Sequence, residues 1–131
     1  MPVYAEFIQD CQDQDRHDLS LLYPEDISGL LQKAQQGKLQ LVAGRFNGRL
    51  IAALTLTPIH SGDYEMARLT VRAITRRRGA ARQLLIQTLK ALPPEISSIS
   101  ANLASAPELS DLFAEIGFHS QGAIWRWHRP A

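Results

Sequence analysis

The residues best suited to chemistry lie where an expected strand gives way to an expected helix. Arginines occupy positions 76–78, and the small residues Gly, Ala and Ala occupy 79–81. The first turn of a helix presents unpaired N–H groups and partial positive charge, and small side chains let an anion reach that backbone. Phosphate is the usual ligand of such a site. The pattern Arg76-x-x-Gly79-x-Ala81 therefore predicts a pyrophosphate-binding turn.

The charge distribution supports an anionic ligand, although the chain's net charge is only +1. Residues 68–82 hold six arginines and no acid, whereas residues 1–26 hold seven carboxylates against one arginine. A solvated helix start remains the alternative. A nucleic-acid surface is disfavoured, because no aromatic residue interleaves with the arginines and the acidic N-terminal third would repel a phosphate backbone. The segment contains neither G-x-G-x-x-G nor G-K-S/T, which excludes a dinucleotide fingerprint and a P-loop.

The elements that position this turn follow from the hydrophobic pattern. Alternating and 3.6-residue periodicities predict a mixed α/β domain with a largely antiparallel sheet. We expect strands at 3–8, 39–46, 49–57, 64–73, 96–102 and 123–128. Helices are expected after residues 13–15, after 26, over 80–92 and over 105–116.

Local signals define several boundaries. Asn47-Gly48 predicts a hairpin with a type I′ turn, because both residues accept positive φ. Ser105 and Glu108 have the spacing of a capping box at the start of a helix. Asp13 or Asp15 is expected to cap the first helix, since a carboxylate accepts from its free N–H groups.

Composition sets the general class. The 131 residues suffice for one domain, 1–131, without disulfides, and Cys11 has no partner. The start of the chain has no basic region followed by an apolar run, and no segment is apolar enough to span a membrane, so we expect a cytoplasmic protein that binds no membrane. The four histidines lack zinc-type spacing, and no metal site is predicted.

The turn at 76–81 resembles motif A of the GNAT acetyltransferase superfamily, Q/R-x-x-G-x-G/A after the fourth strand. The element order is similar to that fold over essentially the whole chain. The resemblance implies that loop amides bind the pyrophosphate of acetyl-CoA or CoA and that the fourth strand lines the pantetheine arm. The coenzyme-binding residues implied are Leu69, Thr70, Val71, Thr75, Arg76, Arg77, Arg78, Gly79, Ala80, Ala81 and Arg82.

A narrower resemblance covers three stretches, residues 13–25, 44–54 and 69–85. Together they look like the PanZ/PanM family of maturation factors for aspartate 1-decarboxylase. It implies an acetyl-CoA-dependent regulator that binds the decarboxylase proenzyme, promotes its self-cleavage to the pyruvoyl form, restrains the mature enzyme and couples pantothenate supply to coenzyme A level. Arg45 and Asn47, at the tip of the expected hairpin, are the candidate partner-binding residues.

An N-acetyltransferase acting on a small amine or a peptide amine is the alternative. In many of the GNAT enzymes that this chain resembles, a tyrosine protonates the departing thiolate. Phe113 stands at the corresponding position here. Glu65, Tyr64 and His119 are candidate bases. Each also has a simpler structural explanation, and no catalytic residue is assigned.

Overall fold

The computed structural model describes residues 2–72 and 79–130, and the statements below concern these residues. In chain order the elements are β1 (Tyr4–Ile8), α1 (Asp13–Leu22), α2 (Ile27–Gln35), β2 (Gln40–Phe46), β3 (Arg49–His60), β4 (Asp63–Val71), α3 (Ala80–Ala91), β5 (Ser98–Asn102), the 3₁₀ helix η2 (Pro107–Leu109), α4 (Ser110–Glu115), β6 (His119–Gln121) and β7 (Ile124–His128).

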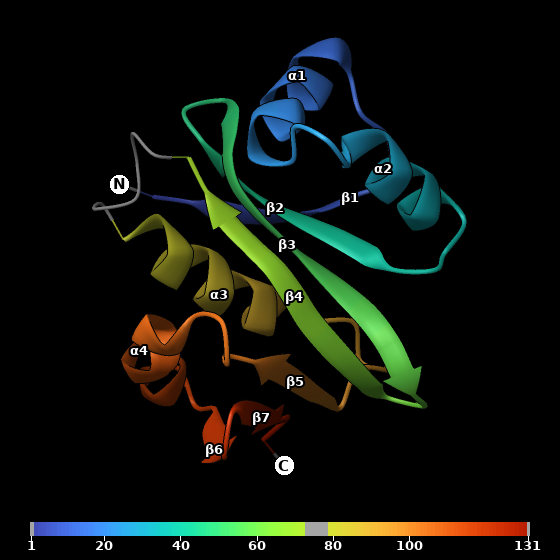
Figure 1. The fold of residues 1–131 in the computed structure, drawn as a ribbon. Helices are drawn as coiled ribbons and strands as arrows, with labels where there is room; N and C mark the ends of the chain where they lie inside the picture. Colours follow the sequence, from blue (N-terminus) through green and yellow to red (C-terminus); the bar gives the residue numbers. More distant parts are fainter. Residues whose placement is uncertain (1, 73–78, 131) are drawn as a thin grey trace.

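The described strands form one sheet in the order β1-β2-β3-β4-β5-β7-β6. Every neighbouring pair is antiparallel except β4 and β5, which run parallel. Helices α1 and α2 cover one side of the sheet, while α3 and α4 lie on the other side (Figure 1). The predicted mixed and largely antiparallel sheet is confirmed.

Two apolar cores hold the layers together. Leu19 of α1 and Leu31 of α2 pack with Leu41 and Leu50 of the sheet. On the opposite face, the second core contains α3 side chains, residues of β2 to β5 and the aromatic residues that follow. Since burial of each large aliphatic side chain contributes about 1.5–3 kcal/mol, both helical layers are anchored to the sheet by hydrophobic burial.

The predicted hairpin is confirmed. Asn47 and Gly48 have φ values of 50° and 78° between β2 and β3, as a type I′ turn requires. Strand β3 continues to His60 rather than ending at 57, because Pro58 is accommodated opposite Tyr64 beside an irregularity in the pairing.

Two predicted helix starts are wrong. Gln12 is the N-cap of α1, so Asp13 and Asp15 lie inside its first turn. The capping box of Ser105 and Glu108 does not form, because Pro107–Leu109 makes a 3₁₀ turn and α4 begins at Ser110. The sequence pattern also missed β6, whose three residues are all polar and exposed.

None of the helices built from the described residues combines the length and apolar character needed to cross a membrane.

Candidate functional site

The sheet opens where β4 separates from β5. Their parallel pairing covers only Asp63–Met66 of β4, and Figure 1 shows the two strands diverging beyond it. Two hollows of about 220 and 450 Å³ lie along the divergent part, lined by residues 66–71 of β4, by Ala81 of α3 and by residues between 101 and 113. We call these two hollows together the β4–β5 gap. The end of β4 and the first turn of α3 both line the larger hollow.

No other described residue crowds the backbone at the start of α3. Gly79 is the N-cap, with a φ of 72°, and a Cβ placed on it would meet no atom within 4 Å among the described residues. The first turn contains no acidic residue. This end of the helix is held by Gln83, whose side-chain oxygen accepts a hydrogen bond from the Val3 amide at 2.8 Å. The arrangement suits the approach of a phosphate group to free helical N–H groups.

Apart from Gly79 and Arg82, the predicted coenzyme-binding residues fall into three groups. Leu69, Thr70 and Val71 line the larger hollow together with Ala81. Ala80 is fully buried in a small cluster with Val3 and Ile51, so its methyl group faces the core and only its backbone is suited to ligand contact. Thr75, Arg76, Arg77 and Arg78 lie outside the described residues.

Two of the six arginines in residues 68–82 form ion pairs within the chain. Arg82 donates to Glu115 at 2.8 Å, and both side chains are half exposed. Arg68 binds Asp26, which stands at the N-cap of α2 but makes no side-chain capping bond. The positive charge available to a ligand is therefore smaller than the count of arginines indicates.

Arg45, a predicted partner-binding residue, is also engaged within the chain. Its guanidinium bonds to Glu6 of β1 and to Asp15 of α1, and it donates to the Gly48 carbonyl at 2.9 Å. The two carboxylates hold the pKa of Arg45 above its usual range. Arg45 thus ties the hairpin tip to β1 and α1, while Asn47 forms the turn with positive φ.

The candidate catalytic residues do not gather at the gap. Phe113 lines it, almost fully buried and packed edge-on against Phe118 with ring centroids 4.9 Å apart. Glu65 and His119 are exposed, and neither lines the gap's described surface. Tyr64 lines a different hollow. At the position that corresponds to the proton-donating tyrosine, the gap is therefore lined by a hydrocarbon ring.

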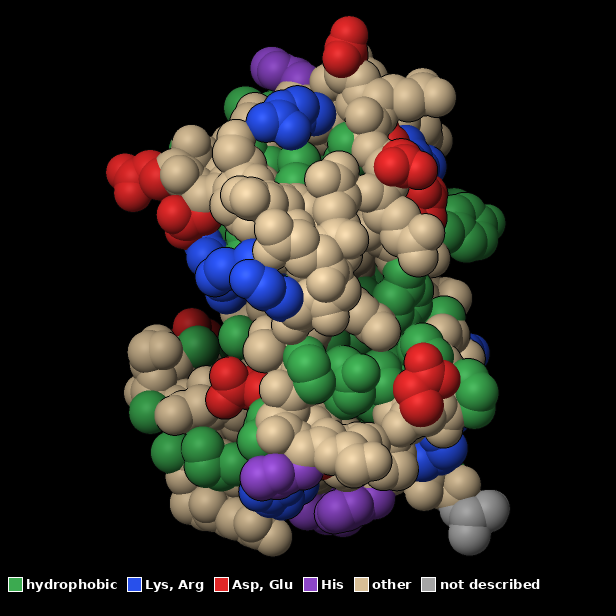
Figure 2. Space-filling view, turned by 90° about the vertical axis from the view of Figure 1, so that its right-hand side faces the viewer, with side chains coloured by type: hydrophobic (Ala, Val, Ile, Leu, Met, Phe, Trp, Pro, Cys, Tyr) green, Lys and Arg blue, Asp and Glu red, His purple; other side chains and the backbone are tan. Residues whose placement is uncertain are grey.

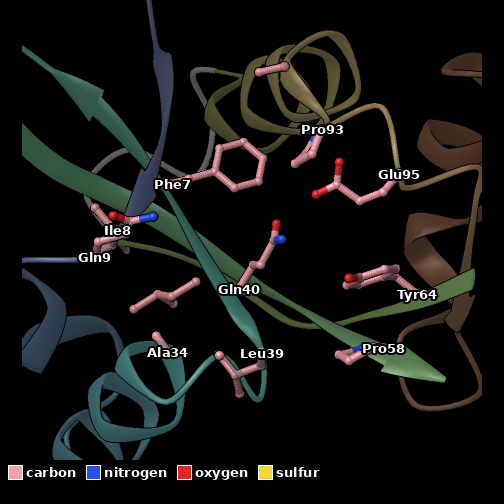
Figure 3. Close-up of a pocket in the computed structure, with 13 residues that line it drawn as sticks. Phe7, Ile8, Gln9, Ala34, Leu39, Gln40, Pro58, Tyr64, Pro93 and Glu95 are labelled. Carbon is pink, nitrogen blue, oxygen red and sulfur yellow. The ribbon is translucent and has the colours of Figure 1, made fainter. Parts of the chain in front are cut away.

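That different hollow has a volume of about 510 Å³ and lies between the end of β1, the start of β2 and the C-terminal end of α3. The side chains of Gln40, Tyr64 and Glu95 point into it beside Phe7 and Pro93 (Figure 3). Figure 2 shows hydrophobic side chains gathered in the middle of the face that carries these strand ends.

This large hollow does not suit a pyrophosphate. Glu95 is the only charged residue among its described lining, and the adjacent C-terminal end of α3 carries partial negative charge. The β4–β5 gap, which reaches the positive end of the same helix, is the better site for an anion, although Glu108 also lies on its surface.

Comparison with known proteins identifies the family. Residues 2–125 match the family described as "Acetyltransferase (GNAT) domain, PanZ". The chain belongs to the PanZ family. A relative from Escherichia coli K12, described as a PanD regulatory factor, is 38% identical over 81 residues, which span 62% of this chain and 61% of the relative. The match therefore covers less than two thirds of that relative's length.

Solved structures confirm the GNAT-like fold predicted for this PanZ-family chain. The solution structure of a putative N-acetyltransferase, YhhK from E. coli, bound to coenzyme A, has a TM-score of 0.76 and 28% identity and covers 98% of this chain and 100% of that one. The PaiA N-acetyltransferase of Thermoplasma acidophilum, in complex with coenzyme A, has a TM-score of 0.68 at 15% identity and covers 98% and 100%.

Proposed function

We propose that this protein binds coenzyme A or acetyl-CoA in the β4–β5 gap and, in the bound form, regulates aspartate 1-decarboxylase. The observation that carries the proposal is the hollow that Leu69, Thr70 and Val71 of β4 share with Ala81 in the first turn of α3. It offers an extended strand for the pantetheine arm and free helical N–H groups for the pyrophosphate. The coenzyme A named with the E. coli and T. acidophilum structures supports this choice of ligand.

The residues at and before the start of α3 suit the phosphates of the ligand. No described atom lies within 4 Å of a Cβ placed on Gly79, which supports a phosphate at this point, and the backbone amides of residues 79–82 are the donors. Arg76, Arg77 and Arg78 precede this turn in the chain and supply positive charge. Arg82 already donates through Nε to Glu115, which offsets part of its charge, so we assign it a weaker role.

The regulatory part of the proposal rests on the relative described as a PanD regulatory factor. In the proposed scheme, the ligand-bound protein docks on the decarboxylase proenzyme and promotes its self-cleavage to the pyruvoyl form. It also restrains the mature enzyme, so that pantothenate synthesis responds to coenzyme A level. Because ligand and partner binding are linked, acetyl-CoA raises the affinity for the decarboxylase, and the decarboxylase raises the affinity for acetyl-CoA by the same factor.

N-acetyl transfer to a small amine or a peptide amine is the second candidate. The geometry favours it less, because Phe113 fills the position of the expected proton donor, and Glu65, Tyr64 and His119 do not line the gap's described surface. Transfer from a thioester needs a group that protonates the thiolate and one that removes a proton from the amine.

One experiment separates the two candidates. The protein is mixed with the proenzyme of aspartate 1-decarboxylase, with and without acetyl-CoA, and intact-mass spectrometry follows both the cleavage and the acetyl-CoA. Faster cleavage with the ligand, while acetyl-CoA remains unconsumed, supports the regulator. Binding of acetyl-CoA without faster cleavage contradicts the regulator, and consumption of acetyl-CoA in a parallel screen of amines then supports the transferase.

A further inference from the structure

Strand β4 contains a bulge at the point where it leaves β5. From Ala53 to Thr55 the partner strand β3 advances two residues, whereas β4 advances three, from Thr70 to Ala67. The extra length contains Arg68, whose φ of 57° lies in the left-handed region. A residue with a β-carbon rarely adopts this conformation, and it persists where surrounding contacts hold it.

Those contacts come from the junction between α1 and α2. The Tyr23 hydroxyl donates to the Arg68 carbonyl at 2.8 Å, across 45 positions of sequence. Tyr23 is only 4% exposed, and burial, partly opposed by the Arg68 charge, raises the pKa of its hydroxyl. The hydroxyl therefore stays protonated at neutral pH and remains available as a donor.

The Arg68 side chain is held by the same junction. Its guanidinium carbon lies 5.2 Å from the centroid of the Tyr23 ring, and one of its nitrogens bonds to Asp26. The amides of Asp26 and Ile27 in turn donate to the Tyr23 carbonyl at 3.2 Å. The carbonyl and the side chain of Arg68 are thus both fixed by one short turn of the chain. We call Tyr23, Asp26 and Arg68 the bulge latch.

The latch acts at the point that shapes the gap. Pairing of β4 with β5 ends at Met66, two residues before the bulge, and Leu69 to Val71 line the gap immediately after it. The backbone direction at Arg68 therefore determines where the N–H and C=O groups of Leu69 and Thr70 point. The latch contacts come from the helical layer that packs on the sheet face opposite α3 and α4.

We propose that Tyr23 and Asp26 are positioning residues that hold the β4 bulge in the shape required by the pantetheine arm, and that they couple the α1–α2 junction to the coenzyme site. The inference rests on the proposed function, because it presumes coenzyme A in the gap. A macromolecule that docks on α1 and α2 and moves this junction would change coenzyme affinity through Arg68, without touching the coenzyme.

The test uses Tyr23→Phe, which removes the hydroxyl and keeps the ring. Calorimetry measures the affinity for coenzyme A and for adenosine 3′,5′-bisphosphate, which lacks the pantetheine arm. The net contribution of one buried hydrogen bond sets an upper limit of about three- to tenfold on the expected loss of coenzyme A affinity. The affinity for the nucleotide should stay unchanged. Tyr4→Phe, at a side chain that is 62% exposed, is the matched control and should alter neither affinity.

Other outcomes are equally informative. An equal loss for both ligands would show a general structural role and overturn the inference, as would an unchanged affinity for coenzyme A. If the wild-type protein binds the nucleotide and coenzyme A with equal affinity, the pantetheine arm makes no contribution. That result would contradict the placement of the arm in the β4–β5 gap as well. Wild-type protein that binds neither ligand contradicts the proposed function itself.

Hydrogen exchange provides a second measurement in the ligand-free protein. In Tyr23→Phe the amides of β4 that pair with β3 on either side of Arg68 should exchange at least about threefold faster than in the wild type, while amides of the two cores keep their protection. Equal acceleration throughout the protein would indicate loss of global stability instead and would overturn the positioning role.

Discussion

Asp18 of α1 is completely buried and binds Arg49, the first residue of β3, through both of its carboxylate oxygens. Arg49 Nε lies 3.0 Å from each oxygen, and the same carboxylate accepts from the Leu50 amide at 3.0 Å. Gln14 also donates to it, at 3.1 Å. This carboxylate therefore fixes α1 to the hairpin that carries Arg45 and Asn47.

The Asp18 site predicts acid sensitivity. Burial by itself raises the pKa of Asp18, but the bonds from Arg49, Leu50 and Gln14 outweigh it and lower the pKa below the ordinary value of 3.8. The unfolded chain thus binds this proton more readily, so the stabilisation is complete above about pH 5 and is lost as the pH falls through 3.8 towards the folded-state pKa. Chemical denaturation of the wild type and of Asp18→Asn at several pH values measures this contribution to the free energy of unfolding.

At pH 7 we expect Asp18→Asn to lower the free energy of unfolding by about 2 kcal/mol, because a charged hydrogen-bond acceptor is lost. The difference between the two proteins should shrink below pH 4. A difference that stays constant down to pH 2 would contradict the assignment.

Gly79→Asp tests the phosphate site. The added carboxylate would stand where phosphate should bind, so the affinity for coenzyme A should fall at least about tenfold, or 1.4 kcal/mol. Asp and Asn both tolerate positive φ better than other residues with side chains, so Gly79→Asn is a control of equal shape. Calorimetry should show a much smaller loss for Asn. Equal losses would mean that bulk rather than charge matters.

Ala81→Glu should move stability and affinity in opposite directions. A carboxylate in the first turn of α3, which has no acid, interacts favourably with the helix dipole and should stabilise the fold by about 0.3–1 kcal/mol. The same charge at the surface of the gap should weaken coenzyme A binding several-fold. Thermal unfolding and calorimetry are compared with Ala81→Gln. A gain in coenzyme affinity would contradict the proposed position of the phosphates.

Arg45→Ala tests the hairpin tip. Loss of its bonds to Glu6 and Asp15 should lower stability by about 1–2 kcal/mol, because the pairs are only partly shielded from water. Coenzyme A affinity should not change, because Arg45 does not line the gap. Binding to the decarboxylase should weaken if the arginine contacts the partner.

Asp15→Asn separates the two roles of Arg45. It weakens the intramolecular pairing but keeps the guanidinium, so binding to the decarboxylase should persist if Arg45 contacts the partner directly. If Asp15→Asn weakens that binding as much as Arg45→Ala does, Arg45 acts through the position of α1 instead.

The parts of the fold set by neighbouring residues could be predicted from the sequence. Asn47 and Gly48 required a tight hairpin, and the apolar spacing of α3 placed Leu84 and Leu85 in the core. The small residues at 79–81 predicted the start of α3, where the structure has Gly79 as the N-cap. Each of these signals lies within a few positions of the chain.

The latch and the ion pairs could not be predicted in the same way. Tyr23 meets Arg68 across 45 positions, and Arg49 meets Asp18 across 31. No local pattern reports such a pairing, which depends on how the helices pack against the sheet. The count of arginines between 68 and 82 also overestimated the available positive charge. Arg68 and Arg82 are paired with carboxylates that lie 42 and 33 residues away in the sequence.

The early end of the β4–β5 pairing gives the sheet an interior edge in addition to the outer edges at β1 and β6. Extended chains of many kinds add to such edges through main-chain hydrogen bonds. A coenzyme seated there would act as a substitute strand and close the seam. Concentrated stocks of the protein should therefore resist aggregation better with coenzyme A present, for a reason separate from any regulatory role.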